Sequence, residues 1–155
     1  MTAEYSVDTS SIIRLHRQLP RDVFPTVWAN LEALIGEGRA VLPRDCHEEL
    51  KKKDDDLKTW ASGLEGFVVQ PSADEVAVAT AITASHPDWV QEQQNAGDPW
   101  VVANASVHGR IVLTEETMKG VGTIDRSLKI PNVAAELGVS YVDFNQLARD
   151  EGWAF

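Results

Sequence analysis

Short apolar runs alternate with amphipathic stretches along the chain. Five runs of three or four residues have the composition of strands, and hydrophobic positions between them recur at helical spacing, as Val27, Leu31 and Leu34 do. Strands that alternate with helices favour a parallel sheet with helices packed on both faces. The pattern therefore predicts an α/β fold, a three-layer sandwich with a mostly parallel five-stranded sheet. The predicted strands are residues 5–7, 39–42, 67–70, 111–113 and 139–142.

The predicted helices begin at residues that favour helix starts. Ser72 and Glu75 form a capping-box sequence, Pro25 lies in the first turn of another helix, and Asp22 is the expected N-cap of that helix. Residues 118–129 contain two glycines and no periodicity, so we expect a mobile loop there. The predicted helices are residues 9–16, 23–35, 43–53, 57–62, 73–85, 87–94, 98–108, 130–137 and a last one from 144 onward.

The chain has 155 residues, of which 43% are hydrophobic and 25% are charged. This length suits a single domain over residues 1–155, which buries roughly 70% of the surface that the unfolded chain exposes. No apolar run reaches the ~20 residues of a membrane span, and the N-terminus lacks the pattern of a signal peptide, so we expect a cytoplasmic protein with no membrane contact. The single cysteine, Cys46, fits a reducing compartment and is expected to be structural.

The formal net charge of −10 counts against broad binding to nucleic acid, because backbone phosphates would be repelled. Acidic residues that surround divalent cations nevertheless become an electropositive site once the metal is bound. The charge therefore does not exclude a nuclease. It does suggest that a stable protein partner would carry basic surface.

Acidic residues recur at comparable places along the predicted fold. Asp8 follows the first strand, Glu49 lies on the helix after the second, Asp98 opens the least polar helix, and Glu116 follows the fourth strand. The carboxyl ends of parallel strands form one edge, where ligands bind in open α/β sheets. Two carboxylates about 4 Å apart repel by ~4 kcal/mol at an effective dielectric near 20, so such a cluster binds cations or keeps extra protons. Oxygen-only ligation favours Mg²⁺ or Mn²⁺.

A simpler interpretation is that these carboxylates cap helices. Asp8 precedes a predicted helix and Asp98 precedes Pro99, and an aspartate at a helix start accepts hydrogen bonds from free backbone N–H groups. When residues 5–13 are considered alone, a helix cap is the better-supported interpretation of Asp8. The chain has no glycine-rich dinucleotide or P-loop motif after any strand and no Gly-x-Ser-x-Gly elbow, so common nucleotide-binding and serine-hydrolase sites are excluded.

Taken together and in order, four segments resemble the PIN domain of metal-dependent ribonucleases. Within this PIN-like superfamily, the chain is most similar to a bacterial branch of unknown function that includes presumed toxins of toxin–antitoxin pairs. Motifs like residues 130–133 and 152–155 also recur in that branch. The resemblance covers nearly the whole chain. The four segments are Val7–Ser10, Glu49–Leu50, Asp98–Ala105 and Val112–Glu116.

The resemblance implies a metal-dependent endoribonuclease in which metal-activated water attacks the RNA phosphodiester in line. It also implies a cognate antitoxin as partner and allows a homodimer. Glu115 competes with Glu116 for the fourth ligand position, which is often Asp in the wider superfamily. Alternatives are an inactive PIN-like binding module, a DNA-directed nuclease or a phosphatase-like hydrolase. The implied catalytic and metal-binding residues are Asp8, Glu49, Asp98 and Glu116, with the hydroxyls of Thr9 and Thr114 as neighbours.

Other residues that suit chemistry have simpler interpretations. Arg14 and Arg17 lie one helical turn apart and are candidates for contact with RNA phosphate, although exposed arginines are usually only solvated. His47 is close to Glu49 in sequence, but the histidines lack metal-binding spacing and are expected at the surface or in packing. Packing is also the expected role of the tryptophans that base stacking would otherwise use. They are Trp60, Trp89, Trp100 and Trp153.

Overall fold

A single five-stranded sheet lies at the centre of the computed structural model, which describes residues 2–91 and 94–155. All the strands are parallel, in the order β3-β2-β1-β4-β5. This confirms the predicted α/β class and its parallel sheet. The strands are β1 (Tyr5–Val7), β2 (Ala40–Pro43), β3 (Val68–Val69), β4 (Ile111–Leu113) and β5 (Tyr141–Val142).

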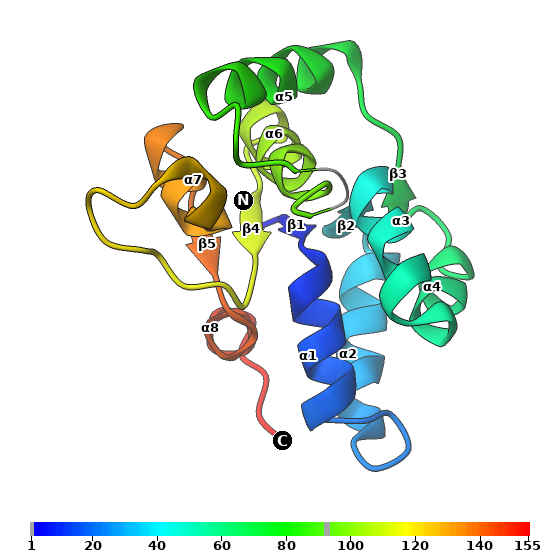
Figure 1. Cartoon of the computed structure of the whole chain (residues 1–155). Helices are drawn as coiled ribbons and strands as arrows, with labels where there is room; N and C mark the ends of the chain where they lie inside the picture. Colours follow the sequence, from blue (N-terminus) through cyan, green and yellow to red (C-terminus); the bar gives the residue numbers. More distant parts are fainter. Residues whose placement is uncertain (1, 92–93) are drawn as a thin grey trace.

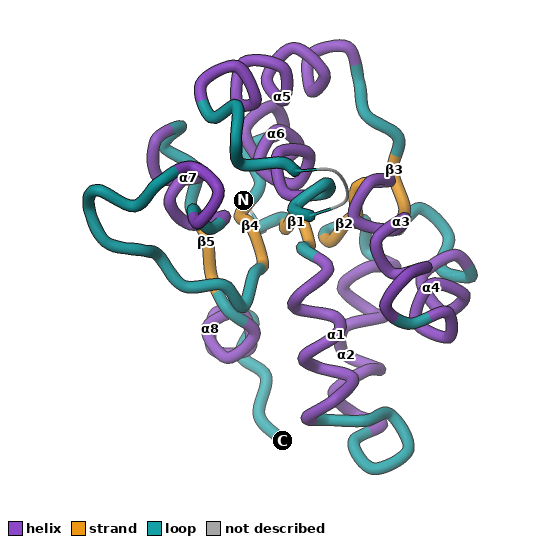
Figure 2. Tube along the Cα trace, viewed as in Figure 1, coloured by secondary structure: helices purple, strands orange, loops and turns teal. Residues whose placement is uncertain are grey.

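Helices cover both faces of the sheet, as expected for connections between parallel strands (Figure 1). In Figure 2, α5, α6 and α7 lie on one side of the strands, α1, α2 and α8 lie on the other, and α3 and α4 lie beside β3. The helices are α1 (Thr9–Gln18), α2 (Pro25–Gly36), α3 (Arg44–Lys53), α4 (Asp55–Ser62), α5 (Ala73–Ser85), α6 (Asp98–His108), α7 (Ile130–Glu136) and α8 (Phe144–Asp150), with a 3₁₀ turn η1 (Asp125–Ser127).

The α6 helix is the most buried helix of the fold. Val101 and Val102 are fully buried, and α6 packs against β1, β2 and β4 as well as against α5 and α7. Because α6 leads back into β4, its first residue lies at the carboxyl edge of the sheet. This geometry is what places Asp98 beside the ends of the central strands. None of the helices in the described ranges is long and apolar enough to cross a membrane.

The α5 helix is tied to α6 by a buried polar network. Ser72 and Glu75 form the predicted capping box at the start of α5. The Glu75 carboxylate also accepts hydrogen bonds from Asn104 Nδ2 at 3.0 Å and from His108 Nε2 at 3.1 Å. Every buried polar group in this network therefore has a partner, which is the usual condition for keeping a carboxylate inside a protein.

One predicted helix is absent from the described residues, and another begins later than predicted. Residues 87–91 form turns and a bridge residue rather than a helix, and residues 92–93 of that predicted helix lie outside the described residues. The reason is Trp89, which is buried and donates its indole N–H to Leu128 O. These tertiary contacts determine the backbone conformation of the segment and override its local helix propensity. The second helix begins at Pro25 with Phe24 at its N-cap, and Asp22 lies outside it.

The segment predicted as a loop, residues 118–129, is irregular but tied to its surroundings. Lys119 N and Lys119 O both bond to the side-chain amide of Asn132 on α7, and the segment contains the turn η1. His86 Nδ1 lies 3.0 Å from Asp125 Oδ1 within that turn. These contacts fix the path of the chain from Glu116 to the start of α7.

Candidate functional site

Asp8 ends β1 and occupies the N-cap position of α1, but its carboxylate makes no capping hydrogen bond. Instead, Asp8 Oδ2 accepts hydrogen bonds from Ser10 Oγ and, at 2.9 Å, from Thr114 Oγ1. The parallel register of β1 and β4 brings Thr114 to this position, because Val7 pairs with Leu113. The capping interpretation of Asp8 was therefore wrong, and Thr114 lies where the sequence predicted.

Asp98 begins α6 with Gly97 at the N-cap, and its carboxylate does not cap the helix either. The residue is only 5% exposed. Among the described residues, none donates a hydrogen bond to its side chain. The only fully buried side-chain nitrogen or oxygen without a partner among the described residues is His16 Nδ1, so the Asp98 carboxylate is not sealed off: it borders a cavity where water or a cation can supply its partner.

Glu49 reaches the same place from α3. The backbone N–H of Gly97 donates a hydrogen bond to Glu49 Oε1. A Cβ atom at position 97 would lie 2.5 Å from Glu49 Oε1 and 3.0 Å from Cys46 Sγ, so a larger residue here would displace the Glu49 carboxylate. Sequence analysis did not predict this role of Gly97. The small residue before Asp98–Pro99 is the only local signal that was present.

Glu116, and not Glu115, joins the other predicted carboxylates. Glu116 Oε1 accepts a hydrogen bond from Ile130 N at 2.9 Å, and the side chain borders the same cavity as Asp8. Glu115 Oε1 accepts from Phe144 N at 3.2 Å, at the start of α8, and borders a neighbouring groove instead. The structure thus separates two adjacent glutamates that the sequence could not distinguish.

Thr9 is a neighbour of Glu49, and its hydroxyl acts to lower the pKa of that carboxylate against the effect of burial. Its Oγ1 donates to Cys46 O at 3.0 Å, which joins α1 to α3, and the side chain does not border the cavity. Cys46 is fully buried, and burial raises the pKa of its thiol well above the usual value. Cys46 is therefore the structural residue that the sequence predicted.

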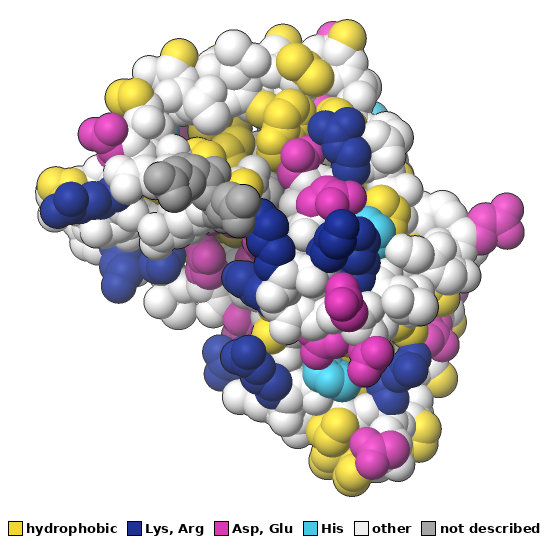
Figure 3. All heavy atoms as spheres, turned by 45° about the vertical axis from the view of Figure 1, so that its right-hand side comes forward, with side chains coloured by type: hydrophobic (Ala, Val, Ile, Leu, Met, Phe, Trp, Pro, Cys, Tyr) yellow, Lys and Arg dark blue, Asp and Glu magenta, His cyan; other side chains and the backbone are white. Residues whose placement is uncertain are grey.

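The four predicted carboxylates border one cavity of about 360 Å³, which we call the carboxylate cavity. Three lysines border it as well, so full ionisation of the carboxylates leaves one negative charge unbalanced. Lys and Arg side chains are interspersed with Asp and Glu on this face of the molecule (Figure 3). No periodic pattern in the sequence predicted these lysines. The cavity is lined by Asp8, Glu49, Asp98 and Glu116 together with Ser10, Lys52, Lys53, Gln94, Asn95 and Lys129.

Burial and mutual repulsion disfavour the ionised forms of these carboxylates. Burial, and next the charge of Glu116, raise the pKa of Asp8 to about 7. Burial and the charge of Asp8 raise the pKa of Asp98 well above its usual value. Burial also raises the pKa of Glu49, against the hydrogen bond from Gly97 and the charge of Lys53. The cavity therefore favours the arrival of protons or of a metal cation.

The donor set fits a hydrated hard cation. In residues 2–91 and 94–155, no three carboxylate, imidazole or thiol side chains stand close enough to hold an ion directly. Mg²⁺ keeps several of its waters in proteins and is usually bound by one or two carboxylates, so a cavity of about 360 Å³ with oxygen ligands around it suits this ion. The Asp98 carboxylate, which accepts no hydrogen bond from residues 2–91 or 94–155, supplies an acceptor that such a cation needs.

Comparison with known proteins places the whole fold in one family. Residues 5–155 match the sequence model of a family described as a domain of unknown function, DUF4411. The chain belongs to this family. No curated protein matches it. In this DUF4411 protein, the match includes every residue of the carboxylate cavity.

The histidines and tryptophans of this DUF4411 protein lie outside the carboxylate cavity. His47 Nε2 is 2.8 Å from Ser62 Oγ, between α3 and α4, and Trp60 packs edge to face on Trp28. Trp89 is 1% exposed. These placements agree with the packing roles that the sequence favoured.

Proposed function

We propose that this protein is a metal-dependent nuclease that hydrolyses RNA phosphodiester bonds at the carboxylate cavity. The observation that carries the proposal is Asp98, a buried carboxylate without a described hydrogen-bond partner that faces a cavity bordered by three further carboxylates. Burying a charge without compensation costs several kcal/mol or more, and a protein retains such a group when a cation completes it.

The surroundings of the other three carboxylates support the same proposal. In each, one oxygen is held by the protein: Asp8 Oδ2 by two hydroxyls, Glu49 Oε1 by Gly97 N–H, and Glu116 Oε1 by Ile130 N–H. Within the described ranges, the second oxygen of each accepts no hydrogen bond. One oxygen thus fixes each side chain, and the other is available to the waters of a hydrated cation or to the cation itself, as in a metal site whose surroundings hold its carboxylates in place.

A divalent cation bound here would polarise the scissile phosphate and lower the pKa of the attacking water. The residues of the chain have complementary tasks. Asp8, Glu49, Asp98 and Glu116 would hold the cation and orient the water by hydrogen bonding. Lys53 and Lys129, whose charges lower the pKa of Glu49 and Asp98 respectively, would bind the non-bridging oxygens of the phosphate.

RNA as substrate and a role as a toxin are proposed on the resemblance to PIN-like ribonucleases. The net charge of −10 supports the proposal of a cognate antitoxin. A stable partner of such an acidic protein is expected to carry a basic surface. A homodimer is compatible with the same resemblance.

Incubation of the purified protein with total cellular RNA, with and without Mn²⁺, tests the proposed activity. We expect new RNA ends only with Mn²⁺, and none with Asp98→Asn. Mapping these ends identifies the RNA class and the cleavage sequence. If neither RNA nor single-stranded DNA is cleaved in any metal, the binding-module alternative replaces this proposal. Cleavage of DNA alone would replace RNA as the substrate.

Expression without a partner tests the toxin role. We expect growth arrest on induction of the wild-type chain and normal growth with Asp8→Ala. Equal toxicity of the two chains, at equal expression levels, would show that catalysis is not the cause of the arrest.

A further inference from the structure

A second hollow of about 640 Å³ opens from the carboxylate cavity along α1. The two share Ser10, Lys53 and Glu116 at their boundary. We call the second hollow the arginine groove, because Arg14 and Arg17 line it beyond that boundary. A strand with one phosphate in the cavity can therefore continue directly into the groove.

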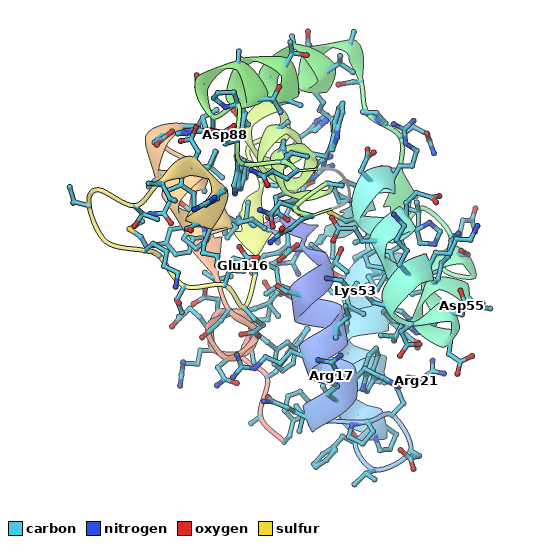
Figure 4. The ribbon with its side chains drawn as sticks, viewed as in Figure 1. Arg17, Arg21, Lys53, Asp55, Asp88 and Glu116 are labelled. Carbon is cyan, nitrogen blue, oxygen red and sulfur yellow. The ribbon has the colours of Figure 1, made fainter. Side chains whose placement is uncertain are left out.

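The charge of the arginine groove differs from that of the molecule as a whole. Arg14, Arg17 and Lys53 border it, against the two glutamates 115 and 116, of which the latter faces the cavity. The protein as a whole carries −10. Figure 4 shows Glu116 and Lys53 on either side of the first turns of α1, with Arg17 further along the same helix. A local surplus of cations on an acidic protein indicates selection of a specific anion rather than general adhesion to polyanions.

Glu115 lies beside one of the two arginines. Its Oε2 lies 3.9 Å from Arg14 Nη1, while its Oε1 is fixed by the backbone N–H of Phe144 at the start of α8. Arg14 and Arg17 are three residues apart, so they project from the same side of α1 and are separated by about 4.5 Å along its axis. Adjacent glutamates thus serve two hollows, with Glu116 at the cavity and Glu115 at the groove.

We propose that the arginine groove binds a backbone phosphate of a single nucleic-acid strand, next to the phosphate that enters the carboxylate cavity. This rests on the proposed function for the position of the scissile phosphate. Asp8 and Asp98 are 2% and 5% exposed, so the scissile phosphate must enter a recess. An unpaired strand can bend into a recess and track a cationic groove, whereas a duplex carries its partner strand with it.

The test compares Arg14→Gln/Arg17→Gln with Arg21→Gln. Arg21 is the matched control, since its side chain is 52% exposed, like the 53% of Arg14, and lies outside both hollows. Binding of fluorescein-labelled uridine and thymidine 12-mers is measured by anisotropy in an Asp98→Asn background, which prevents cleavage. We expect the double variant to bind at least tenfold more weakly, with a salt slope smaller by about 0.7, as the loss of one neutralised phosphate predicts. A hairpin duplex should bind more weakly than either 12-mer.

Equal affinities of the double variant and Arg21→Gln would overturn the groove proposal. So would tighter binding of the hairpin duplex than of the single strands. The uridine and thymidine arms distinguish RNA from DNA as the source of the phosphate. Hydrolysis of bis(p-nitrophenyl) phosphate with Mn²⁺ by the wild-type chain reports on the cavity separately. If neither this ester nor RNA or single-stranded DNA is hydrolysed, the proposed function fails, while the anisotropy measurement still decides the groove.

Discussion

Glu75 and Asp98 are carboxylates with nearly the same burial and opposite surroundings. Glu75 is 4% exposed and accepts hydrogen bonds from Ser72 N, Asn104 and His108, whereas Asp98 is 5% exposed and accepts none from described residues. Burial by itself raises the pKa of Glu75, but these hydrogen bonds outweigh it and hold the pKa below the usual value. At Asp98, burial and the charge of Asp8 act in the same direction and raise the pKa.

The comparison distinguishes a structural carboxylate from one reserved for a ligand. At Glu75, the fold supplies all the donors that the charge needs, and the result is a link between α5 and α6. At Asp98, the residues that the structure describes supply burial, like charges and the partly opposing charge of Lys129 but no hydrogen-bond donor, so the ionised side chain is disfavoured without a metal. Proteins keep such groups mainly at functional sites.

Asp98→Asn should have the largest effect on activity. Loss of one cation ligand is expected to lower the rate of RNA cleavage by roughly a thousandfold, or about 4 kcal/mol. The same substitution removes a repulsive charge, so the metal-free variant should resist urea better than the metal-free wild type. Cleavage assays and urea unfolding in EDTA measure the two effects. A variant that loses activity and also loses stability in EDTA would contradict the assignment of Asp98 as a ligand.

Glu75→Ala should lower the stability of the protein and leave its cleavage activity nearly unchanged. It leaves Asn104, His108 and the backbone N–H of Ser72 without their acceptor, which is expected to cost about 3 kcal/mol of unfolding free energy. Urea unfolding measures this loss. Below its unfolding temperature, the variant should keep metal-dependent cleavage within a few-fold of wild type. If Glu75→Ala abolished cleavage while still folded, the two carboxylates would not have separate roles.

The pH dependence of stability sharpens the comparison. The pKa of Asp8 is about 7 in the folded protein, above its usual 3.8, so between these pH values the folded state holds more protons than the unfolded state. In EDTA, stability should therefore fall as the pH rises through this window, by up to about 1.4 kcal/mol per pH unit for each such proton. The contribution of Glu75 has the opposite sign. It is present above the usual Glu pKa and is lost as the pH falls through the lowered value.

Urea midpoints between pH 4.5 and 7.5 measure this dependence. In Asp98→Asn, stability should fall less steeply as the pH rises, because one acid and its repulsion of Asp8 are removed. In the wild type, added Mn²⁺ should abolish this pH dependence of stability. Identical curves for the wild type and Asp98→Asn would show that repulsion in the cavity does not contribute to stability.

Gly97→Ala is expected to have the smallest of these effects. The new Cβ would lie 2.5 Å from Glu49 Oε1 and displace that carboxylate, which should weaken Mn²⁺ binding about tenfold. Gly120→Ala is the matched control, because a Cβ there meets nothing within 4 Å. Calorimetric titration of both variants measures the difference. Unchanged Mn²⁺ affinity in Gly97→Ala would mean that Glu49 is not a ligand.

The sequence predicted the parts of this fold that depend on local pattern. Periodicity and strand order were enough to place Asp8 and Glu116 at one sheet edge, because parallel strands end together. The link from Gly97 N–H to Glu49 was missed, since it joins residues 48 apart and depends on how α3 packs on α6. The helix predicted over 87–94 failed for the same reason, because the burial of Trp89 overrides local propensity.

The central claim is that the carboxylate cavity holds a divalent cation, and calorimetric titration of the metal-free protein with Mn²⁺ at pH 7.5 tests it most directly. We expect saturable binding by the wild type, similar binding by Glu75→Gln, and at least tenfold weaker binding by Asp98→Asn. No binding by the wild type, or equal binding by Asp98→Asn, would contradict the account.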